Sequence, residues 1–304
     1  MRPTSTVTAR STVSAPTRRT MSETDQLPAA PPPELRFRRG FAFKSALTKL
    51  WSARHVVWNL GMRELRVRYN QAVLGFGWAI IGPVVLMVII STLLKQASGV
   101  KINTHGWPYP IFLYTGLLAW TFFSNAVSSA GNILVSNPLL NKIYAPREVF
   151  VLGTIGTSIV DGLAATLVLG VLFAIYQRSP AATVVWVPVA LVVLLAYALG
   201  VGLIFAAATV YMRDLRQVLP LLLQFGLFAT PVIWPLSKLA PRTREIYVAL
   251  NPVGAVIDTL RRTMLYGQAP DPAILGIGAA SSALVLIFGY ALFKRLETGF
   301  ADVS

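Results

Sequence analysis

Long apolar runs, each about 20 residues in length and almost free of charged side chains, are the feature that most constrains this chain. A helical run of that length spans the roughly 30 Å of hydrocarbon in a bilayer. A soluble helix would instead alternate apolar and polar residues with helical period. Only 13% of the 304 residues are charged, whereas about 25% is usual in soluble domains. The sequence therefore predicts an all-α integral membrane protein.

Six membrane-spanning helices are expected from these runs. They cover residues 74–94, 110–130, 150–176, 183–211, 217–234 and 272–293. If the N-terminus is inside, the inner segments hold 19 of the 27 Lys and Arg residues and the outer segments hold 8. Positive residues concentrate on the cytoplasmic side of membrane proteins, so both termini are predicted to be cytoplasmic.

The region before the first span divides into two parts. Residues 1–40 are rich in Thr, Ser, Pro and Ala without apolar periodicity, which predicts a disordered tail. Within 41–73, two stripes with helical spacing predict an amphipathic helix in the cytoplasmic interface; a short helix packed on protein is the alternative. The apolar stripe is Ala46, Leu50, Ala53, Val57 and Leu60, and the polar one is Lys49, Ser52, His55, Asn59 and Arg63. Residues 74–304 then form a six-helix transmembrane domain.

The outer segment from 235 to 271 is long and too apolar for a free loop, notably at Asn251-Pro252-Val253-Gly254-Ala255-Val256-Ile257. We expect re-entrant half-helices between the fifth and sixth spans. Such segments are tolerated only where protein or water covers their backbone, which makes this one a candidate outer gate. A pair of surface helices is an equally open interpretation.

Several classes of chemistry are disfavoured by the residues present. The chain has no cysteine and only His55 and His105 as histidines, so we expect no metal site. It contains no Gly-rich phosphate loop, so it cannot hydrolyse ATP alone and is not expected to be an enzyme. The basic residues, which give a net charge of +15, lie at predicted helix ends, which indicates membrane topology rather than nucleic-acid binding.

Asp161 is the one Asp, Glu, Lys, Arg or His within a predicted span, which makes it a functional candidate. It is interpreted either as a structural hydrogen-bonding group that faces Ser or Thr of a neighbouring helix, or as a group used in transport. A lone carboxyl group argues against a proton relay, because a relay needs partners in series.

The segment before the first span, Met62-Arg63-Glu64-Leu65-Arg66-Val67-Arg68-Tyr69-Asn70-Gln71-Ala72-Val73-Leu74-Gly75, resembles the signature of permease subunits of type-two ABC exporters for O-antigen, teichoic acid, capsule and galactan. Ala72 is a minor departure, at a position where a small or hydroxyl residue is common. Five more motifs follow in the family's order: Asn141 to Glu148, Tyr211 to Arg216, Thr230 to Pro235, Leu250-Asn251-Pro252 and Phe300 to Val303. The resemblance covers residues 62–303.

This resemblance implies a homodimer that works with two copies of a cytoplasmic ATPase, which would hold ATP and Mg, while this chain holds no cofactor. It also implies a bacterial inner or plasma membrane. The first inner loop would contact the ATPase through exposed side chains, namely Asn141, Lys142, Tyr144, Arg147 and Glu148; a solvated loop is the alternative.

Two groups of residues suit a lipid-linked glycan as the cargo. Arginine forks bind phosphate bidentately, so Arg63, Arg66 and Arg68 at headgroup depth would receive a polyprenyl pyrophosphate, although topological anchoring explains them about equally well. Aromatic faces stack on sugar rings, and the predicted conduit residues are Phe76, Trp78, Gln224, Phe225, Phe228 and Trp234. The sequence thus favours an exporter of a lipid-linked polysaccharide, with an exporter of drugs or small lipids and an ion-coupled secondary transporter as alternatives.

Overall fold

Helices are the regular elements throughout the residues that the computed structural model describes, 54–69, 77–96, 102–136 and 146–297, all of which belong to one compact unit. The long helices are α3 (Gly77–Gln96), α4 (Tyr109–Ser136), α5 (Glu148–Ile175), α6 (Val187–Tyr211) and α10 (Pro272–Glu297). The shorter elements are α2 (Arg54–Tyr69), η2 (Ala182–Trp186), α7 (Leu215–Ala229), η3 (Leu236–Lys238), α8 (Pro241–Leu250) and α9 (Pro252–Met264). The predicted tail, residues 1–40, lies outside the described residues.

Five of the described helices are long and apolar enough to cross a membrane: α3, α4, α5, α6 together with η2, and α10. They correspond to five of the six expected spans. The sixth candidate, α7, has 15 residues and is therefore about 22 Å long, short of the roughly 30 Å of hydrocarbon. The continuous helix expected up to Trp234 ends instead at Ala229.

Prolines set where several of these helices begin. α8, α9 and α10 start at Pro241, Pro252 and Pro272, and α6 has Pro188 in its first turn. Proline suits the first turn because its fixed φ is helical and its missing N–H would have no partner there. This local rule separates α8 from α9 at Asn251, where the backbone leaves helical geometry for one residue.

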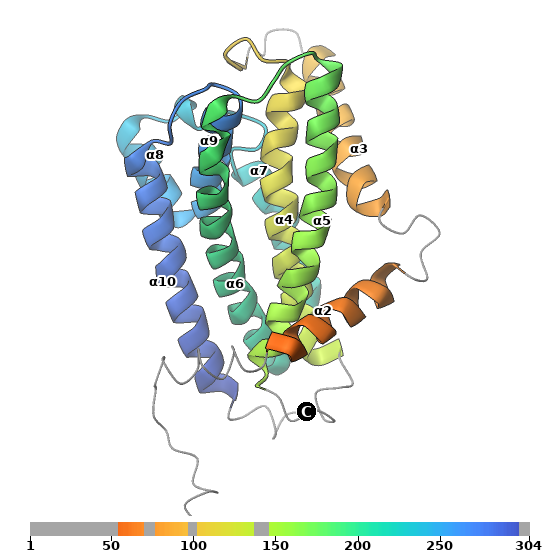
Figure 1. Cartoon of the computed structure of the whole chain (residues 1–304). Helices are drawn as coiled ribbons and strands as arrows, with labels where there is room; N and C mark the ends of the chain where they lie inside the picture. Colours follow the sequence, from red (N-terminus) through yellow and green to blue (C-terminus); the bar gives the residue numbers. More distant parts are fainter. Residues whose placement is uncertain (1–53, 70–76, 97–101, 137–145, 298–304) are drawn as a thin grey trace, which may run out of the picture. The chain divides into compact units, whose positions relative to one another are not determined.

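The long helices lie side by side, with α4 packed against α5 and α6, and α6 packed against α10 (Figure 1). α2 crosses the end of this bundle at which α6 and α10 finish, whereas α8 and α9 lie at the opposite end (Figure 1). The chain between α6 and α8, which includes α7, therefore runs from one end of the bundle to the other.

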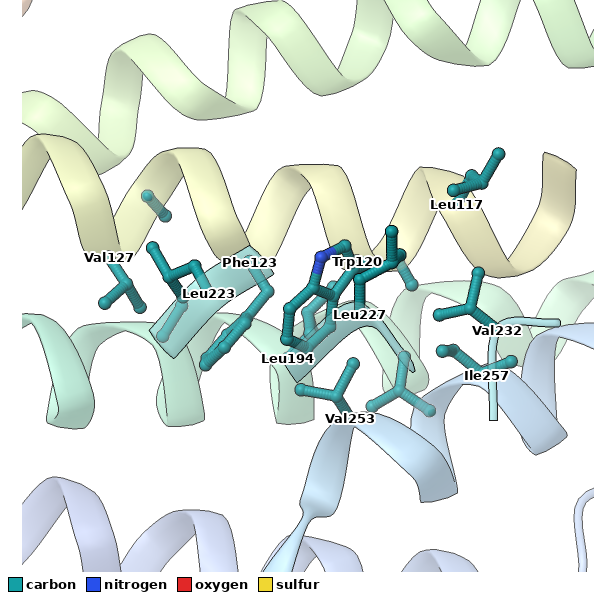
Figure 2. Packing of buried hydrophobic residues seen from close by; sticks show 14 of the residues in the cluster. Leu117, Trp120, Phe123, Val127, Leu194, Leu223, Leu227, Val232, Val253 and Ile257 are labelled. Atoms are coloured by element: carbon teal, nitrogen blue, oxygen red, sulfur yellow. The ribbon is translucent and has the colours of Figure 1, made fainter. Parts of the chain in front are cut away.

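The core lies where α4, α6, α7 and α9 meet. Figure 2 shows Trp120 and Phe123 of α4 against Leu223 and Leu227 of α7, next to Leu194 of α6. Gly226 of α7 faces the Trp120 ring so closely that an added Cβ would lie 2.6 Å from it, so a side chain there would push α7 away from α4.

α9 is packed inside the bundle. Val253, Ala255, Val256 and Ile257 are completely buried, and the helix contacts α4, α6 and α10. This burial fits the expected re-entrant half-helix and argues against a pair of surface helices. α8 is more exposed, with Leu250 at its end 78% accessible.

Candidate functional site

The backbone between α7 and α8 leaves helical geometry. Thr230 and Pro235 both have extended dihedral angles, with ψ of 147° and 141°. Proline disfavours helical geometry in the residue before it, so Pro231 ends α7 at Ala229. We call residues 230–235 the break. Inside a membrane the carbonyl groups exposed by such a break must find donors within the protein, since lipid offers none.

Two tyrosines supply part of these donors. Tyr247 of α8 donates its hydroxyl hydrogen to the carbonyl of Ala229 at 2.6 Å. Tyr109 of α4 donates to the carbonyl of Ile233 at 3.2 Å. The residue before the break and a residue within it are thus held from different helices.

Asn251, between α8 and α9, joins two of the sequence motifs. Its side-chain amide donates to the Thr230 hydroxyl at 2.9 Å and to the Tyr247 hydroxyl at 3.0 Å. The Thr230 carbonyl accepts from the backbone N–H of Val232 at 2.7 Å. The Thr-Pro-Val-Ile-Trp-Pro and Leu-Asn-Pro segments, which sequence reasoning treated separately, therefore form one arrangement.

Arg261 of α9 satisfies three more carbonyls of the break. Its guanidinium donates to Pro231 at 2.8 Å, to Val232 at 2.5 Å and to Trp234 at 3.2 Å. It also donates twice to the carbonyl of Phe112 in the first turn of α4, at 3.2 and 3.3 Å. One arginine thereby ties α9 and α4 to the break.

The surroundings of Arg261 are closed. The residue is only 2% exposed, and its guanidinium carbon lies 3.5 Å from the centre of the Phe112 ring, a cation–π contact. A Cβ on Gly116 would lie 2.8 Å from one guanidinium nitrogen, so the glycine makes room for the cation. In the described part of the chain no carboxylate accepts a hydrogen bond from Arg261; carbonyl dipoles and an aromatic face surround it instead.

Sequence reasoning missed this residue, although a signal was present. Residues 253, 256, 257, 260 and 261 recur with the spacing of one helical face. The first four are Val, Val, Ile and Leu, and all are buried. An arginine on the apolar face of a predicted re-entrant helix is a marker for a buried cation.

Asp161 of α5 has a partner from α2. Tyr69, the last residue of that helix, donates its hydroxyl hydrogen to the carboxylate of Asp161. Farther back, Gly61 of α2 meets Gly153 of α5 backbone to backbone, where an added Cβ would lie 3.3 Å from a carbonyl oxygen. Asp161 thus has a tyrosine as one partner, where a Ser or Thr was predicted. α2 contacts α5 at both of these points.

The first inner loop corrects one expectation. Glu148, expected to be an exposed charge, is buried and forms an ion pair with Lys294 of α10 at 2.8 Å. Lys294 also pairs with Glu297 at 2.8 Å, and Glu297 accepts from the backbone N–H of Arg147 at 3.4 Å. Glu148 begins α5 facing the end of α10, and this packing covers it. Asn141, Lys142 and Tyr144 lie outside the described residues.

The basic cluster predicted to receive a pyrophosphate lies on α2. Arg63 and Arg66 are exposed and one helical turn apart, while the side chain of Arg68 lies outside the described part. Trp58, also on α2, is 69% exposed. One side of α2 therefore packs on α5, and the other side presents cations and an aromatic ring.

The predicted conduit residues that the structure describes do not form one cluster. Gln224, Phe225 and Phe228 share one face of α7, with the two phenylalanines 70% and 59% exposed. Trp78 of α3 is also exposed, whereas Trp234 is half-buried with its ring edge to face with Tyr247. Phe76 lies outside the described residues.

Comparison with known proteins identifies relatives. The family model for ABC-2 type transporters matches residues 55–265. The O-antigen export system permease protein RfbA of Myxococcus xanthus is 28% identical, covering 84% of this chain and 97% of the relative. The protein of the same name from Klebsiella pneumoniae is 24% identical, covering 79% and 92%. The polysialic acid transport protein KpsM of Escherichia coli is 26% identical, covering 78% and 92%.

The family match spans α2 through α9, and therefore includes the break, Asn251 and Arg261. It also agrees with the long apolar helices of the bundle. The chain is a multi-pass, all-helical membrane protein that belongs to the ABC-2 type transporter family.

Proposed function

We propose that this chain is the permease subunit of an ATP-driven exporter that moves a lipid-linked polysaccharide across the inner or plasma membrane. The observation that carries the proposal is that the O-antigen export permeases and the polysialic acid transport protein resemble this chain over more than nine-tenths of their own length. A drug exporter of the same architecture is the competing assignment within the family.

ATP hydrolysis belongs to a separate cytoplasmic subunit in this proposal. The chain contains no Gly-rich phosphate loop, so two ATPase copies, with ATP and Mg, would join two copies of this chain. Both termini would lie in the cytoplasm with α2. The first inner loop, with Asn141, Lys142, Tyr144 and Arg147, would contact the ATPase, and Glu148 would connect that loop to α10 through Lys294.

The exposed face of α7 supports the homodimer and a conduit. It presents Gln217 and Gln224 together with Phe225 and Phe228. A face in contact only with lipid would not favour amide groups, because each leaves unpaired polar atoms in hydrocarbon. Facing a second copy across a path for sugars, the amides would bond hydroxyl groups and the rings would stack on pyranose faces.

The break and the α8–α9 pair would form the outer gate of this path. They lie at the end of the bundle opposite α2 (Figure 1). Arg63, Arg66 and Arg68 would receive the pyrophosphate of the carrier lipid at the α2 end. The cargo would then enter at one end of the bundle and leave at the other.

Depleting the chain in its native host tests the function. Surface polysaccharide should fall while lipid-linked polymer accumulates inside, because synthesis continues and export stops. The measurement is polymer on intact cells against polymer in lipid extracts. Normal surface polymer with new sensitivity to drugs would instead favour the drug exporter.

Arg66→Lys tests the proposed pyrophosphate site. Lysine keeps the charge that sets topology but loses the planar fork that binds phosphate. Losing one charge-assisted hydrogen bond, worth roughly 1.5 to 3 kcal/mol, should weaken binding about tenfold or more. Stimulation of the partner ATPase by lipid-linked glycan should therefore require more glycan, while expression and orientation stay unchanged. An unchanged glycan requirement would leave Arg66 as a topology signal.

A further inference from the structure

The break is held by side chains from three helices that are distant in sequence. Tyr109 comes from α4, Tyr247 from α8 and Arg261 from α9. Together with one backbone hydrogen bond, they supply a donor for each carbonyl from Ala229 to Trp234. None of these acceptors has a regular helical partner. The position of the break therefore depends on side-chain donors.

Arg261 makes the largest share of these hydrogen bonds. Three of the six carbonyls accept from it, and its bonds to Phe112 connect the same guanidinium to α4. Its burial means that water does not compete for these donors, which strengthens each bond. If the break moved away from α4 and α9, three carbonyls and one cation would lose partners together.

Phe228, on the exposed face of α7, lies one residue before the first of these carbonyls. Anything that frees the break from α4 and α9 would also free this end of α7. Leu227 and Val232 pack beside Val253 and Ile257 in the same region (Figure 2), so the apolar contacts and the Arg261 bonds hold the same segment.

We propose that Arg261, together with Tyr109 and Tyr247, is the clasp that keeps the outer gate closed, and that the gate opens when the carbonyls of the break leave Arg261. The role of the clasp in export rests on the proposed function. The clasp itself requires no particular cargo. Arg261 acts here as a positioning residue, because it holds main-chain groups rather than a substrate.

Single-cysteine labelling tests the clasp, since the natural chain contains no cysteine. The reporter is Phe228→Cys in the complete complex with its ATPase, without ATP, exposed to a membrane-impermeant thiol reagent from outside. With Arg261 intact, the closed gate should separate the conduit face of α7 from the outer solution in the assembled complex, so the reporter should react slowly. Arg261→Lys keeps the charge but cannot reach three carbonyls, so labelling should accelerate about tenfold. Ser237→Cys, exposed in η3, reports full access in each background.

Arg242→Gln is the matched control, because Arg242 is an exposed arginine of the neighbouring helix α8; it should leave the labelling rate unchanged. Tyr109→Phe and Tyr247→Phe each remove one hydroxyl donor and keep the ring, and should give smaller accelerations.

An unchanged rate in Arg261→Lys complexes that still assemble with the ATPase would overturn the clasp. If Arg261→Lys fails to assemble, the two tyrosine variants decide, and wild-type rates in both would overturn it. A faster rate, in a transporter whose depletion leaves surface polysaccharide unchanged, would support the clasp while contradicting the proposed cargo.

Discussion

Three charged residues are buried in the part of the chain that the structure describes, and each has a partner from another element. Arg261 has carbonyl groups, Asp161 has the Tyr69 hydroxyl, and Glu148 has Lys294. Burying a charge without such partners is strongly unfavourable. Each of these residues therefore depends on an element that is remote in sequence.

The Glu148 and Lys294 pair makes an asymmetric prediction. Lys294→Met removes the cation that Glu148 and Glu297 share, and should destabilise the protein by about 3 kcal/mol. Glu148→Gln leaves Lys294 paired with Glu297 and should cost about 1 kcal/mol. Thermal unfolding of the purified protein measures both, with the exposed Arg242→Gln as control. Equal effects would show that Glu297 does not share Lys294.

At the scale of elements, glycines decide how closely helices approach. Gly200 of α6 and Gly289 of α10 meet backbone to backbone, and an added Cβ on Gly200 would lie 2.7 Å from the nitrogen of Leu286. Membrane helices associate through such small residues because lipid provides little hydrophobic drive between them. The contact between α6 and α10 therefore requires glycine at both positions.

Gly289→Ala should destabilise the protein by about 1 to 3 kcal/mol, because the methyl group forces two backbones apart. Gly276→Ala, on the same helix, is the control: no atom lies within 4 Å of its added Cβ. Alanine favours helix there, and stability should rise by up to about 1 kcal/mol. Melting temperatures of the two variants test this contrast, and a Gly289→Ala protein as stable as wild type would contradict the close contact.

At the scale of the whole molecule, the topology depends on α7, which is too short to cross the hydrocarbon of a bilayer as a helix. α6 finishes at the end of the bundle that α2 crosses, and α8 lies at the opposite end (Figure 1). The 15 residues of α7 and the extended break share the crossing between them. A membrane-spanning route that is partly non-helical is possible because side chains satisfy the break.

Cysteine labelling of intact cells tests this topology. A cysteine at Ser237 should react with an impermeant reagent from outside, and cysteines at Asn141 and Ser304 should be protected. The physical reason is the concentration of Lys and Arg in the predicted inner segments. Labelling that is protected at Ser237 and open at Ser304 would mean that α7 does not complete a crossing.

Much of the fold could be predicted from local patterns. The length and composition of the apolar runs predicted the long helices. Pro231 marks the end of α7, and Pro252 marks the start of α9. The candidate site was predicted only in part. Asn251 and the break were singled out as separate motifs, Glu148 was wrongly expected to be exposed, and Arg261 was missed.

The sequence by itself determined the class of this protein, because a long apolar segment in lipid satisfies its own backbone as a helix whatever its neighbours are. Only the tertiary structure decided which side chains serve the break and which charges are neutralised. Arg261 and Phe112 are 149 residues apart, and Lys294 and Glu148 are 146 apart. Such contacts depend on how helices pack across the bundle, and no local periodicity specifies that packing.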